Sequence, residues 1–352
     1  MKVLLGLLLS AVVASPSGGT AMTTPRAAHT ATLLASGEVL IAGGCSVDGC
    51  ELDDRARTTE LFDPRAGRFR AGPPLLRARV GHAAVRLRDG SVLVAGGWGA
   101  SDPTATAELY EPGHGFSRLP PMTTPRGGFS ATLLRDGRVL IAGGTDGRRS
   151  LRSAELFDPR SRSFRATGSM RSPRAAHAAA VVRGGRVLVA GGSADGRVLA
   201  STEVYDPRTG RFTPARAMTL PRHKHAAVSL RDGAALIVGG SNDRDFQGRY
   251  RSAELYTPRR GRFIRVGQMS EARFKLPDAV VRLPSGHVLV AGGARRAELY
   301  DPARRGFRRA GDAGPTLSFS TATVLRDGRV LVAGGYDNRI AVTTRARIIS
   351  PR

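Results

Sequence analysis

The sequence contains two cysteines and one tryptophan among 352 residues, and it lacks the common catalytic motifs. Cys45 and Cys50 have no histidine near them, which makes them a poor zinc site. No nucleophile elbow, Walker loop or clustered metal motif occurs in the chain. No stretch after residue 14 is apolar for long enough to span a membrane. These absences argue against a zinc protein, a nucleotide-binding enzyme and a membrane-spanning protein.

A pair of glycines recurs seven times along the chain, each time after a short apolar run. The pairs are Gly43-Gly44, Gly96-Gly97, Gly143-Gly144, Gly191-Gly192, Gly239-Gly240, Gly292-Gly293 and Gly334-Gly335, with successive spacings of 53, 47, 48, 48, 53 and 42 residues. A period in this range is typical of propellers and repeat arrays, in which one unit cannot bury its faces alone. We therefore expect all seven repeats to form one domain.

Each repeat predicts four short antiparallel strands, a to d. In the third repeat, the run Phe129 to Leu134 (strand a) precedes Asp136-Gly137, which predicts a type I′ hairpin turn, and the apolar run Val139 to Ala142 (strand b) follows. Strands c and d each carry one aromatic residue that would pack between neighbouring sheets. These are Phe62, Tyr110, Phe157, Tyr205, Tyr256 and Tyr300 on strand c, and Phe69, Phe116, Phe164, Phe212, Phe263 and Phe307 on strand d. The pattern predicts an all-β, seven-bladed β-propeller, with a stacked solenoid as the alternative.

The repeat resembles the kelch family over residues 26–350. The resemblance rests on the strand-b diglycine, on the ELFDP and ELYDP segments and on the strand-d aromatic, and the wording is similar to bacterial secreted kelch-like proteins and to the propeller of galactose oxidase. One departure is that phenylalanine stands where kelch units commonly have tryptophan on strand d. The resemblance implies a propeller fold and says little about activity, because one fold hosts many functions.

The N-terminus has the order of a secretory signal: Lys2, an apolar core, then small residues to Ala14. Cleavage after Ala14 or after Ala21 fits this order, and an anchor helix is the alternative. Residues 22–352 are predicted to be a single propeller, with blades near 26–72, 73–121, 122–169, 170–217, 218–267, 268–311 and 312–352. Blade 7 lacks a strand d after residues 347–350, and by alignment Ser15 to Ala21 would supply it.

The formal net charge is +25, and the excess is almost entirely arginine, since the only lysines are Lys2, Lys224 and Lys275. Such a field attracts polyanions, although an arginine-rich, lysine-poor chain is also typical of a GC-rich genome. Export to the periplasm or outside the cell makes nucleic acid an improbable partner. An oxidising compartment also favours a local disulfide between Cys45 and Cys50 over free thiols.

Aromatic residues outside the strand-c and strand-d framework concentrate on one predicted face, where loops b–c and d–a lie. They are Trp98, Phe129, Phe246, Tyr250, Phe274, Phe319 and Tyr336. Aromatics on loops over a rigid scaffold favour a surface for a sugar or a peptide. The alternative is that they plug the channel mouth or pack beneath long loops.

A ring of cations is predicted on the same face, three residues before the start of strand a. Its members are Arg26, Arg79, Arg126, Arg174, Arg222 and Lys275, with Leu317 in blade 7. Kelch proteins that hold acidic peptides use arginines near this place, so the resemblance implies a carboxylate or phosphate site. The alternative is a salt bridge within each blade to the glutamate that opens strand c, because blade 7 lacks both the cation and, at Arg347, the glutamate.

Histidine begins strand a in four blades, at His29, His82, His177 and His225, where the other blades have Phe129, Asp278 and Ser320. These positions are a blade or more apart, so we expect structural hydrogen bonds to backbone at the strand start rather than a metal site. No cofactor is expected.

The sequence thus favours an exported, monomeric binding module without catalytic activity. Its expected ligand is an acidic glycan or an acidic peptide, and an anionic cell-surface polymer is a further candidate. The alternative is a sugar-active enzyme that uses the same channel mouth, of the sialic-acid mutarotase or galactose oxidase type. The copper site of galactose oxidase uses a tyrosine cross-linked to a cysteine, whereas both cysteines here lie in one loop.

Overall fold

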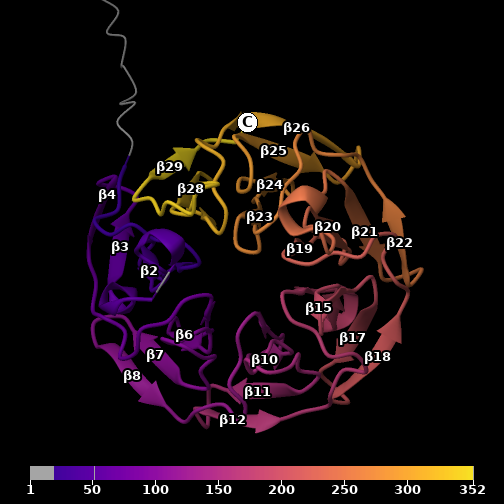
Figure 1. Cartoon of the computed structure of the whole chain (residues 1–352), viewed down its shortest axis with the longest axis horizontal. Helices are drawn as coiled ribbons and strands as arrows, with labels where there is room; N and C mark the ends of the chain where they lie inside the picture. Colours follow the sequence, from indigo (N-terminus) through magenta and orange to yellow (C-terminus); the bar gives the residue numbers. More distant parts are fainter. Residues whose placement is uncertain (1–19, 51, 352) are drawn as a thin grey trace, which may run out of the picture.

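The computed structural model describes residues 20–50 and 52–351, which form a ring of seven antiparallel blades around a central channel (Figure 1). Six blades have four strands, and the seventh has three in the described part of the chain. The prediction of an all-β, seven-bladed propeller is therefore confirmed. No helix in residues 20–50 and 52–351 has the length and apolar character needed to cross a membrane.

The strands follow one another from the channel outward in every blade. Blade 1 has β1 (Thr30–Leu33), β2 (Val39–Ala42), β3 (Thr59–Asp63) and β4 (Arg68–Ala71). Blade 2 has β5 (Ala83–Arg86), β6 (Val92–Ala95), β7 (Ala107–Glu111) and β8 (Gly115–Leu119). Blade 3 has β9 (Ser130–Leu133), β10 (Val139–Ala142), β11 (Ala154–Asp158) and β12 (Ser163–Ala166). Blade 4 has β13 (Ala178–Val181), β14 (Val187–Ala190), β17 (Thr202–Asp206) and β18 (Arg211–Ala215).

The remaining blades repeat this order. Blade 5 has β19 (Ala226–Ser229), β20 (Ala235–Val238), β21 (Ala253–Thr257) and β22 (Arg262–Arg265). Blade 6 has β23 (Val280–Arg282), β24 (Val288–Val290), β25 (Arg296–Asp301) and β26 (Gly306–Asp312), and blade 7 has β27 (Thr321–Val324), β28 (Val330–Ala333) and β29 (Ala346–Ile349). Loops and turns add β15 (Ser193–Ala194), β16 (Arg197–Val198) and the 3-10 turns η1 (Asp48–Cys50), η2 (Asp54–Arg57), η3 (Arg183–Gly185) and η4 (Asp245–Gly248).

The cores lie between neighbouring blades. Strand b is buried on both faces, as β10 illustrates, because a blade covers each side. Phe157 on β11 contacts Phe164 on β12 at 5.0 Å between ring centroids, and both pack against apolar residues of blade 2. The equivalent pair recurs in the first six blades, with centroid distances from 4.8 to 5.2 Å. The predicted packing of these aromatics between sheets is confirmed.

The hairpin between strands a and b differs from the predicted type I′ turn. In blade 3 only Gly137 has a positive φ, of 92°, while Asp136 does not. Leu134 accepts a hydrogen bond from the Gly137 N–H, and its own N–H donates to the Arg138 carbonyl. This is a three-residue loop in which the glycine forms a bulge, and the Asp136 carboxylate accepts the Arg138 N–H at 3.0 Å. The carboxylate stabilises the turn without requiring a left-handed aspartate.

The diglycine of strand b joins each blade to the next. The N–H of Gly144 donates to the carbonyl of Arg174 in blade 4 at 2.8 Å, and the equivalent bond recurs around the ring to Gly335 and Arg26 at 2.7 Å. Both Gly143 and Gly144 have positive φ, and a Cβ on Gly143 would lie 2.6 Å from the Arg174 carbonyl oxygen. Only glycine permits this close approach between blades.

The ring closes beside the N-terminal segment (Figure 1). The Ala346 N–H donates to the Thr20 carbonyl at 3.0 Å, and the Met22 N–H donates to the Thr344 carbonyl at 2.8 Å. Met22 is buried against β28 and β29. The expected closing strand, Ser15 to Ala21, is thus present at Thr20 and Ala21, and its residues 15–19 lie outside the described residues, as does the predicted signal at 1–14.

Candidate binding site at the channel mouth

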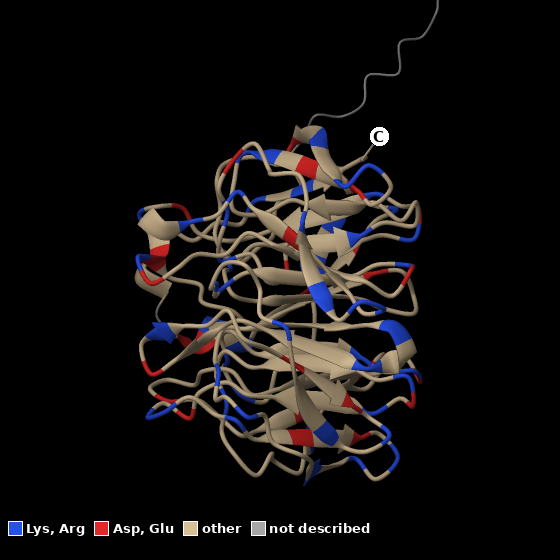
Figure 2. Ribbon diagram, turned by 90° about the vertical axis from the view of Figure 1, so that its right-hand side faces the viewer, with Lys and Arg blue, Asp and Glu red and all other residues tan. Residues whose placement is uncertain are grey.

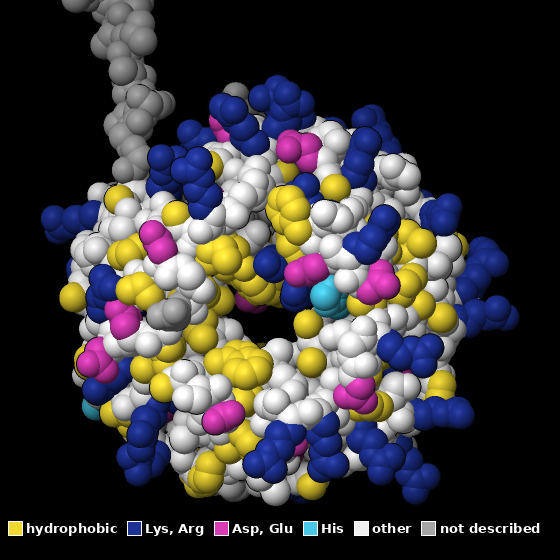
Figure 3. All heavy atoms as spheres, in the orientation of Figure 1, with side chains coloured by type: hydrophobic (Ala, Val, Ile, Leu, Met, Phe, Trp, Pro, Cys, Tyr) yellow, Lys and Arg dark blue, Asp and Glu magenta, His cyan; other side chains and the backbone are white. Residues whose placement is uncertain are grey.

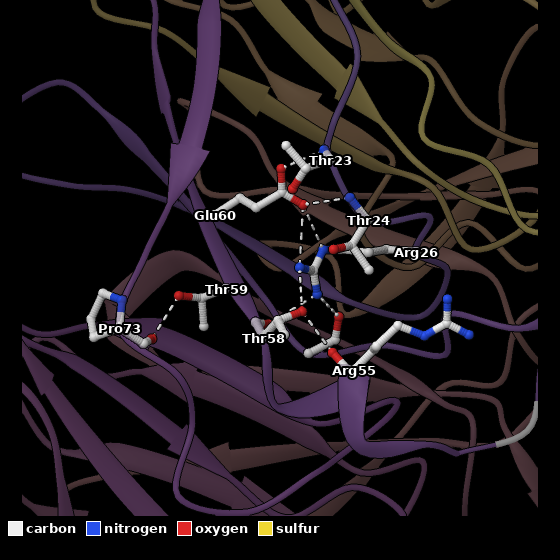
Figure 4. A network of polar contacts seen from close by, with 9 residues as sticks. Thr23, Thr24, Arg26, Arg55, Thr58, Thr59, Glu60 and Pro73 are labelled. Atoms are coloured by element: carbon white, nitrogen blue, oxygen red, sulfur yellow. Dashed lines mark hydrogen bonds and ion pairs between the residues drawn. The ribbon is translucent and has the colours of Figure 1, made fainter.

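The arginine that precedes strand a is buried in a network of its own blade (Figure 4). The Arg26 side chain is fully buried, and it donates to the carbonyls of Gly43 and Thr58 at 3.0 and 2.9 Å. Its Nη2 atom lies 3.2 Å from Glu60 Oε1. Glu60 also accepts the backbone N–H of Thr23 at 2.7 Å. The ion pair therefore fixes strand c and the incoming d–a loop to strand b.

The same network recurs in six blades. The pairs are Arg26–Glu60 at 3.2 Å, Arg79–Glu108 at 2.6 Å, Arg126–Glu155 at 3.0 Å, Arg174–Glu203 at 3.1 Å, Arg222–Glu254 at 2.9 Å and Arg273–Glu298 at 2.7 Å. Burial lowers the pKa of each arginine, and the paired glutamate opposes that shift. These arginines stabilise the scaffold and do not face the solvent at the mouth.

Blade 6 corrects the predicted ring, because Arg273 and not Lys275 holds the buried position. Leu276 follows Arg273 by three residues, as His225 follows Arg222, and its side chain lies against Gly239 of the preceding blade as His225 lies against Gly191. Pro277 and Asp278 are thus two extra residues before the strand, which begins at Val280. Because of these two residues, the sequence predicted Lys275 in place of Arg273 and Asp278 in place of Leu276. Asp278 is exposed, yet loss of hydration among the surrounding strands raises the pKa of its carboxyl to about 6.

Three of the four histidines hydrogen-bond to a side-chain hydroxyl of the preceding blade, whereas the sequence predicted bonds to backbone at the strand start. His29 Nε2 lies 3.0 Å from Thr321 Oγ1, His82 Nε2 lies 3.0 Å from Thr30 Oγ1, and His177 Nε2 lies 2.9 Å from Ser130 Oγ. In blade 4, Ala178 stands at the position that corresponds to Ser130, and neither ring nitrogen of His225 has a partner among the described residues. Within residues 20–50 and 52–351, no three His, Cys, Asp or Glu residues are grouped so that they could hold a metal ion.

Seven residues with left-handed backbone form what we call the mouth ring, one from each blade, two positions after the arginine or its blade 7 counterpart Leu317. They are Ala28, Gly81, Gly128, Ala176, Lys224, Lys275 and Phe319, with φ from 50° to 60°. Backbone N–H groups donate to the carbonyl of the neighbouring member, for example Lys275 to Lys224 at 2.9 Å and Phe319 to Lys275 at 2.8 Å. Among the described residues, only the step from Gly128 to Gly81 lacks this bond.

The mouth ring is lopsided. Blades 1 to 4 contribute alanine or glycine, whereas blades 5 to 7 contribute Lys224, Lys275 and Phe319. Figure 3 shows hydrophobic and cationic side chains around the opening on this face. Backbone is therefore accessible on one half of the mouth, and side chains project from the other half.

Lys275 lies among three aromatic rings. Its Nζ atom is 4.9 Å from the centroid of Phe274, 5.5 Å from that of Tyr336 and 6.0 Å from that of Phe319. No carboxylate of the described residues lies within 4 Å of it, whereas Lys224 pairs with Asp245 at 3.1 Å. The rings stabilise the ammonium through cation–π contacts. The ammonium therefore remains available for an anion from outside the protein.

The other predicted aromatics surround this cluster. Phe246, which is 44% exposed, contacts Phe274 at 5.8 Å and stacks under Arg249 at 3.9 Å. Tyr250 packs over the buried Arg222 at 5.1 Å. Phe274 and Tyr336 are themselves buried, at 3% and 8% exposure. The structure thus brings five of the predicted aromatics together on blades 5 to 7, of which Phe246 is exposed and Tyr250 and Phe319 are partly exposed.

Trp98 and Phe129 lie apart from them, on blades 2 and 3. The Trp98 indole lies against Gly127, where a Cβ would be 2.6 Å from the ring, and beside Gly81 of the mouth ring. The Phe129 ring occupies the place in blade 3 that His82 and His177 occupy in their own blades, against the preceding diglycine. Trp98 is thus a partly exposed neighbour of the mouth, whereas the Phe129 side chain packs between blades 2 and 3.

The Cys45–Cys50 disulfide is confirmed, with the two Cα atoms 4.9 Å apart. Cys45 is buried with Ala27 and Tyr336, and Phe319 packs against the same cluster. The disulfide therefore supports the aromatic wall of the mouth in blade 7 from the neighbouring blade 1.

The mouth ring could not be predicted from residue type, because its members share none. The signal that does mark it is positional, since each member stands two residues after the buried arginine or Leu317. The two extra residues of blade 6 obscure this pattern, in which four blades have a small residue at that place and the others have Lys224, Lys275 and Phe319.

Comparison with known proteins agrees with this geometry. Two repeats, residues 126–171 and 174–219, match the Kelch motif family. Among solved structures, the chain is similar to a fungal alcohol oxidase of the AA5 family in complex with copper, with a TM-score of 0.76 and 18% identity, over 95% of this chain and 76% of that one. At that identity the likeness shows the fold alone. No curated protein matches the sequence. The described residues thus form a seven-bladed β-propeller in which two repeats match the Kelch motif.

Proposed function

We propose that this propeller is a binding module without catalytic activity that holds an acidic glycan or an acidic peptide at the channel mouth. The observation that carries the proposal is Lys275, an ammonium without a carboxylate partner among the described residues and within 6.0 Å of three aromatic ring centroids. A carboxylate can pair with this ammonium while the rest of the ligand stacks on exposed aromatic surface.

The lopsided mouth ring supports the same site. The ligand would lie over the small residues of blades 1 to 4, with Trp98 at one side and Lys275 opposite. Between Gly81 and Gly128 the hydrogen-bonded ring is interrupted, so the ligand can bond to backbone there. Since the six buried arginines are already paired, they contribute to this site only by fixing the loops.

The test is a glycan and acidic-peptide array on the folded protein, followed by titration of the best ligand with variants. Lys275→Asn removes the charge, and asparagine tolerates the left-handed φ of 55° at this position. We expect the affinity to fall about tenfold, or about 1.4 kcal/mol. Trp98→Ala should cost roughly 1–3 kcal/mol of binding free energy.

The matched control is Arg148→Gln, which removes one exposed cation from a b–c loop on the same face. Its affinity should stay within about twofold of the unmodified protein, and added salt should weaken binding through Lys275. Equal effects of Lys275→Asn and Arg148→Gln, or no binding to any acidic member of the array, would contradict the proposal.

The alternative is a sugar-active enzyme at the same mouth. Its one supporting observation is the likeness to the copper-bound alcohol oxidase, and likeness at 18% identity supports the fold and not the activity. The binding module is therefore the function that we prefer.

We also propose that the protein is exported, on the strength of residues 1–14 and of the Cys45–Cys50 disulfide, which an oxidising compartment favours. Intact mass of protein recovered from the periplasm or the medium should show loss of the N-terminal segment. Recovery of the full-length chain from the cytosol with both thiols free would contradict export.

A further inference from the structure

The face opposite the channel mouth carries a second concave surface. Turns a–b and c–d form this face, seen along the right-hand edge of Figure 2, where many Lys and Arg residues lie in the turns. An open groove of about 500 Å³ crosses blades 4 to 6 there. It runs from the a–b turn of blade 4 at Arg183, past the c–d turn of blade 5 at residues 257–262, to Arg305 in blade 6.

The groove is lined by an excess of one charge. Its cations are Arg183, Arg259, Arg260, Arg262, Arg265 and Arg305, all exposed, and Asp232 is its only acidic residue. None of these six guanidinium groups lies within 4 Å of a carboxylate in the described part of the chain. The Asp232 carboxylate already accepts the Ala234 N–H at 3.0 Å. We call this surface the arginine groove.

Blade 5 differs from its neighbours at this place in a second way. The c–d turn begins with an acidic residue in blades 1, 2, 3, 4 and 6, at Asp63, Glu111, Asp158, Asp206 and Asp301. In blade 5 that residue is Thr257, whose hydroxyl donates to the Arg262 carbonyl at 2.9 Å. The turn has thus lost the carboxylate that would neutralise its arginines, while keeping a side-chain hydrogen bond that holds its shape.

A neighbouring hollow extends the cationic surface. Arg260 and Arg262 also line a second open depression of about 560 Å³, together with Arg216 of blade 4. Two adjoining hollows that share two arginines make a track longer than a single small anion. Guanidinium groups pair well with oxyanions through their fork of N–H donors.

We infer that the arginine groove binds a linear polyanion carrying tetrahedral oxyanions, phosphate or sulfate. The oxyanions of the polymer pair with successive guanidinium groups from Arg216 through Arg260 and Arg262 to Arg183. This site is separate from the channel mouth and takes a ligand with repeated charges rather than one carboxylate. It lies mainly on the other face of the ring and extends along the outer strand of blade 4 to Arg216, which follows β18.

The experiment measures binding of inorganic polyphosphate and of heparin to the full-length protein, with uncharged dextran as the negative probe. The groove variant is Arg259→Gln with Arg262→Gln. The matched control is Arg65→Gln with Arg68→Gln, the same two places in the c–d turn of blade 1, both exposed and outside the groove. Both variants lose the same net charge.

We expect at least a tenfold loss of polyanion affinity in the groove variant and less than a threefold loss in the control. Loss for polyphosphate alone identifies phosphate as the ligand group, and loss for heparin alone identifies sulfate. Equal losses in the two variants would show that net charge alone attracts the polymer and would overturn the inference, as would absence of binding to both polymers. Folding of each variant is checked by its thermal midpoint.

Discussion

At the scale of single residues, the buried arginine–glutamate pair is the most repeated device in the molecule. Arg126 uses its guanidinium on two carbonyls, Ser153 Oγ and Glu155, and the glutamate accepts backbone N–H groups of the d–a loop as well. Removing one partner leaves the other charge buried and unpaired, which is far more destabilising than losing a surface pair.

We therefore expect Arg126→Gln and Glu155→Gln each to lower the free energy of unfolding by about 3–5 kcal/mol. In a double-mutant cycle measured by urea denaturation, the two effects should couple strongly. Arg138→Gln, which breaks the more exposed pair with Asp136, is the control and should cost less than about 1 kcal/mol. Additive effects of Arg126→Gln and Glu155→Gln would show that the pair is not a unit.

The buried histidines make stability depend on pH. Burial lowers the pKa of His29 and of His177 to about 3, and it lowers the pKa values of His82 and His225 well below 6.5. Below pH 6.5 the unfolded chain binds protons that the folded chain does not bind. The free energy of unfolding should thus fall as pH decreases from about 6.5 toward 3, by about 1.4 kcal/mol per unit for each histidine.

The chain contains its own matched replacement for one of these histidines. Blade 3 has Phe129 where blade 4 has His177, and Ala83 stands at the position of blade 2 that corresponds to Ser130, the hydrogen-bond partner of His177. The double variant His177→Phe with Ser130→Ala copies that pair, and it should remove about one quarter of the slope of unfolding free energy against pH between pH 6 and 4. An unchanged slope would mean that His177 does not titrate on unfolding as proposed.

At the scale of the blade, neighbouring blades contact one another where their strands a begin. We call each such contact a joint. His29, His82 and His177 each hydrogen-bond to a hydroxyl of the preceding blade, whereas the corresponding residue for His225 is Ala178, which has no hydroxyl. Blade 6 needs no hydrogen bond at this place, because the apolar Leu276 packs in one cluster with Ala226. The joint between blades 4 and 5 is thus the one histidine joint of the described ring that lacks its hydrogen bond.

Ala178→Ser should supply that bond and raise the free energy of unfolding by about 1 kcal/mol. The control, Ala226→Ser, places the same hydroxyl opposite Leu276, where it has no acceptor, so it should destabilise the fold. Thermal and urea denaturation measure both variants. Destabilisation of similar size by both changes would show that His225 cannot use the new hydroxyl.

The blades could be predicted from the sequence because the features that define each strand lie within a few residues of one another. Diglycines, turn residues and the aromatics of strands c and d each follow from one strand's own pattern, and the pairs of Phe157 with Phe164 and its equivalents followed from them. The site could be predicted only in part. Lys275 was predicted as a site residue, but as an equivalent of the buried arginines that pair with glutamate. Two extra residues in blade 6 place the true equivalent, Arg273, two positions earlier. Burial decides which cation is free, and burial depends on neighbouring blades.

At the scale of the whole molecule, closure of the ring depends on a few contacts of the N-terminal segment. Thr20, Ala21 and Met22 lie along β29, and Met22 fills the core between blades 7 and 1. Cleavage of the proposed signal after Ala14 would keep these contacts, whereas cleavage after Ala21 would remove two of the three residues.

A chain that begins at Thr23 should therefore unfold at a lower temperature than a chain that begins at Ser15, with a loss of about 3 kcal/mol, comparable to deleting a buried methionine side chain. Met22→Ala in the longer chain separates side-chain packing from backbone pairing. Equal thermal midpoints for all three proteins would show that β29 needs no partner from the N-terminus.

The mouth ring has a consequence for how such a protein can be retargeted. Its seven members are held by bonds between their own backbones, and their side chains are not needed for the bonds that connect the blades. Four of these positions can therefore be substituted without loss of the fold, provided that the new residue tolerates a left-handed backbone. They are Ala28, Gly81, Gly128 and Ala176. A combinatorial library of glycine, alanine, asparagine and lysine at these four positions would sample many shapes of the channel mouth on one unchanged backbone.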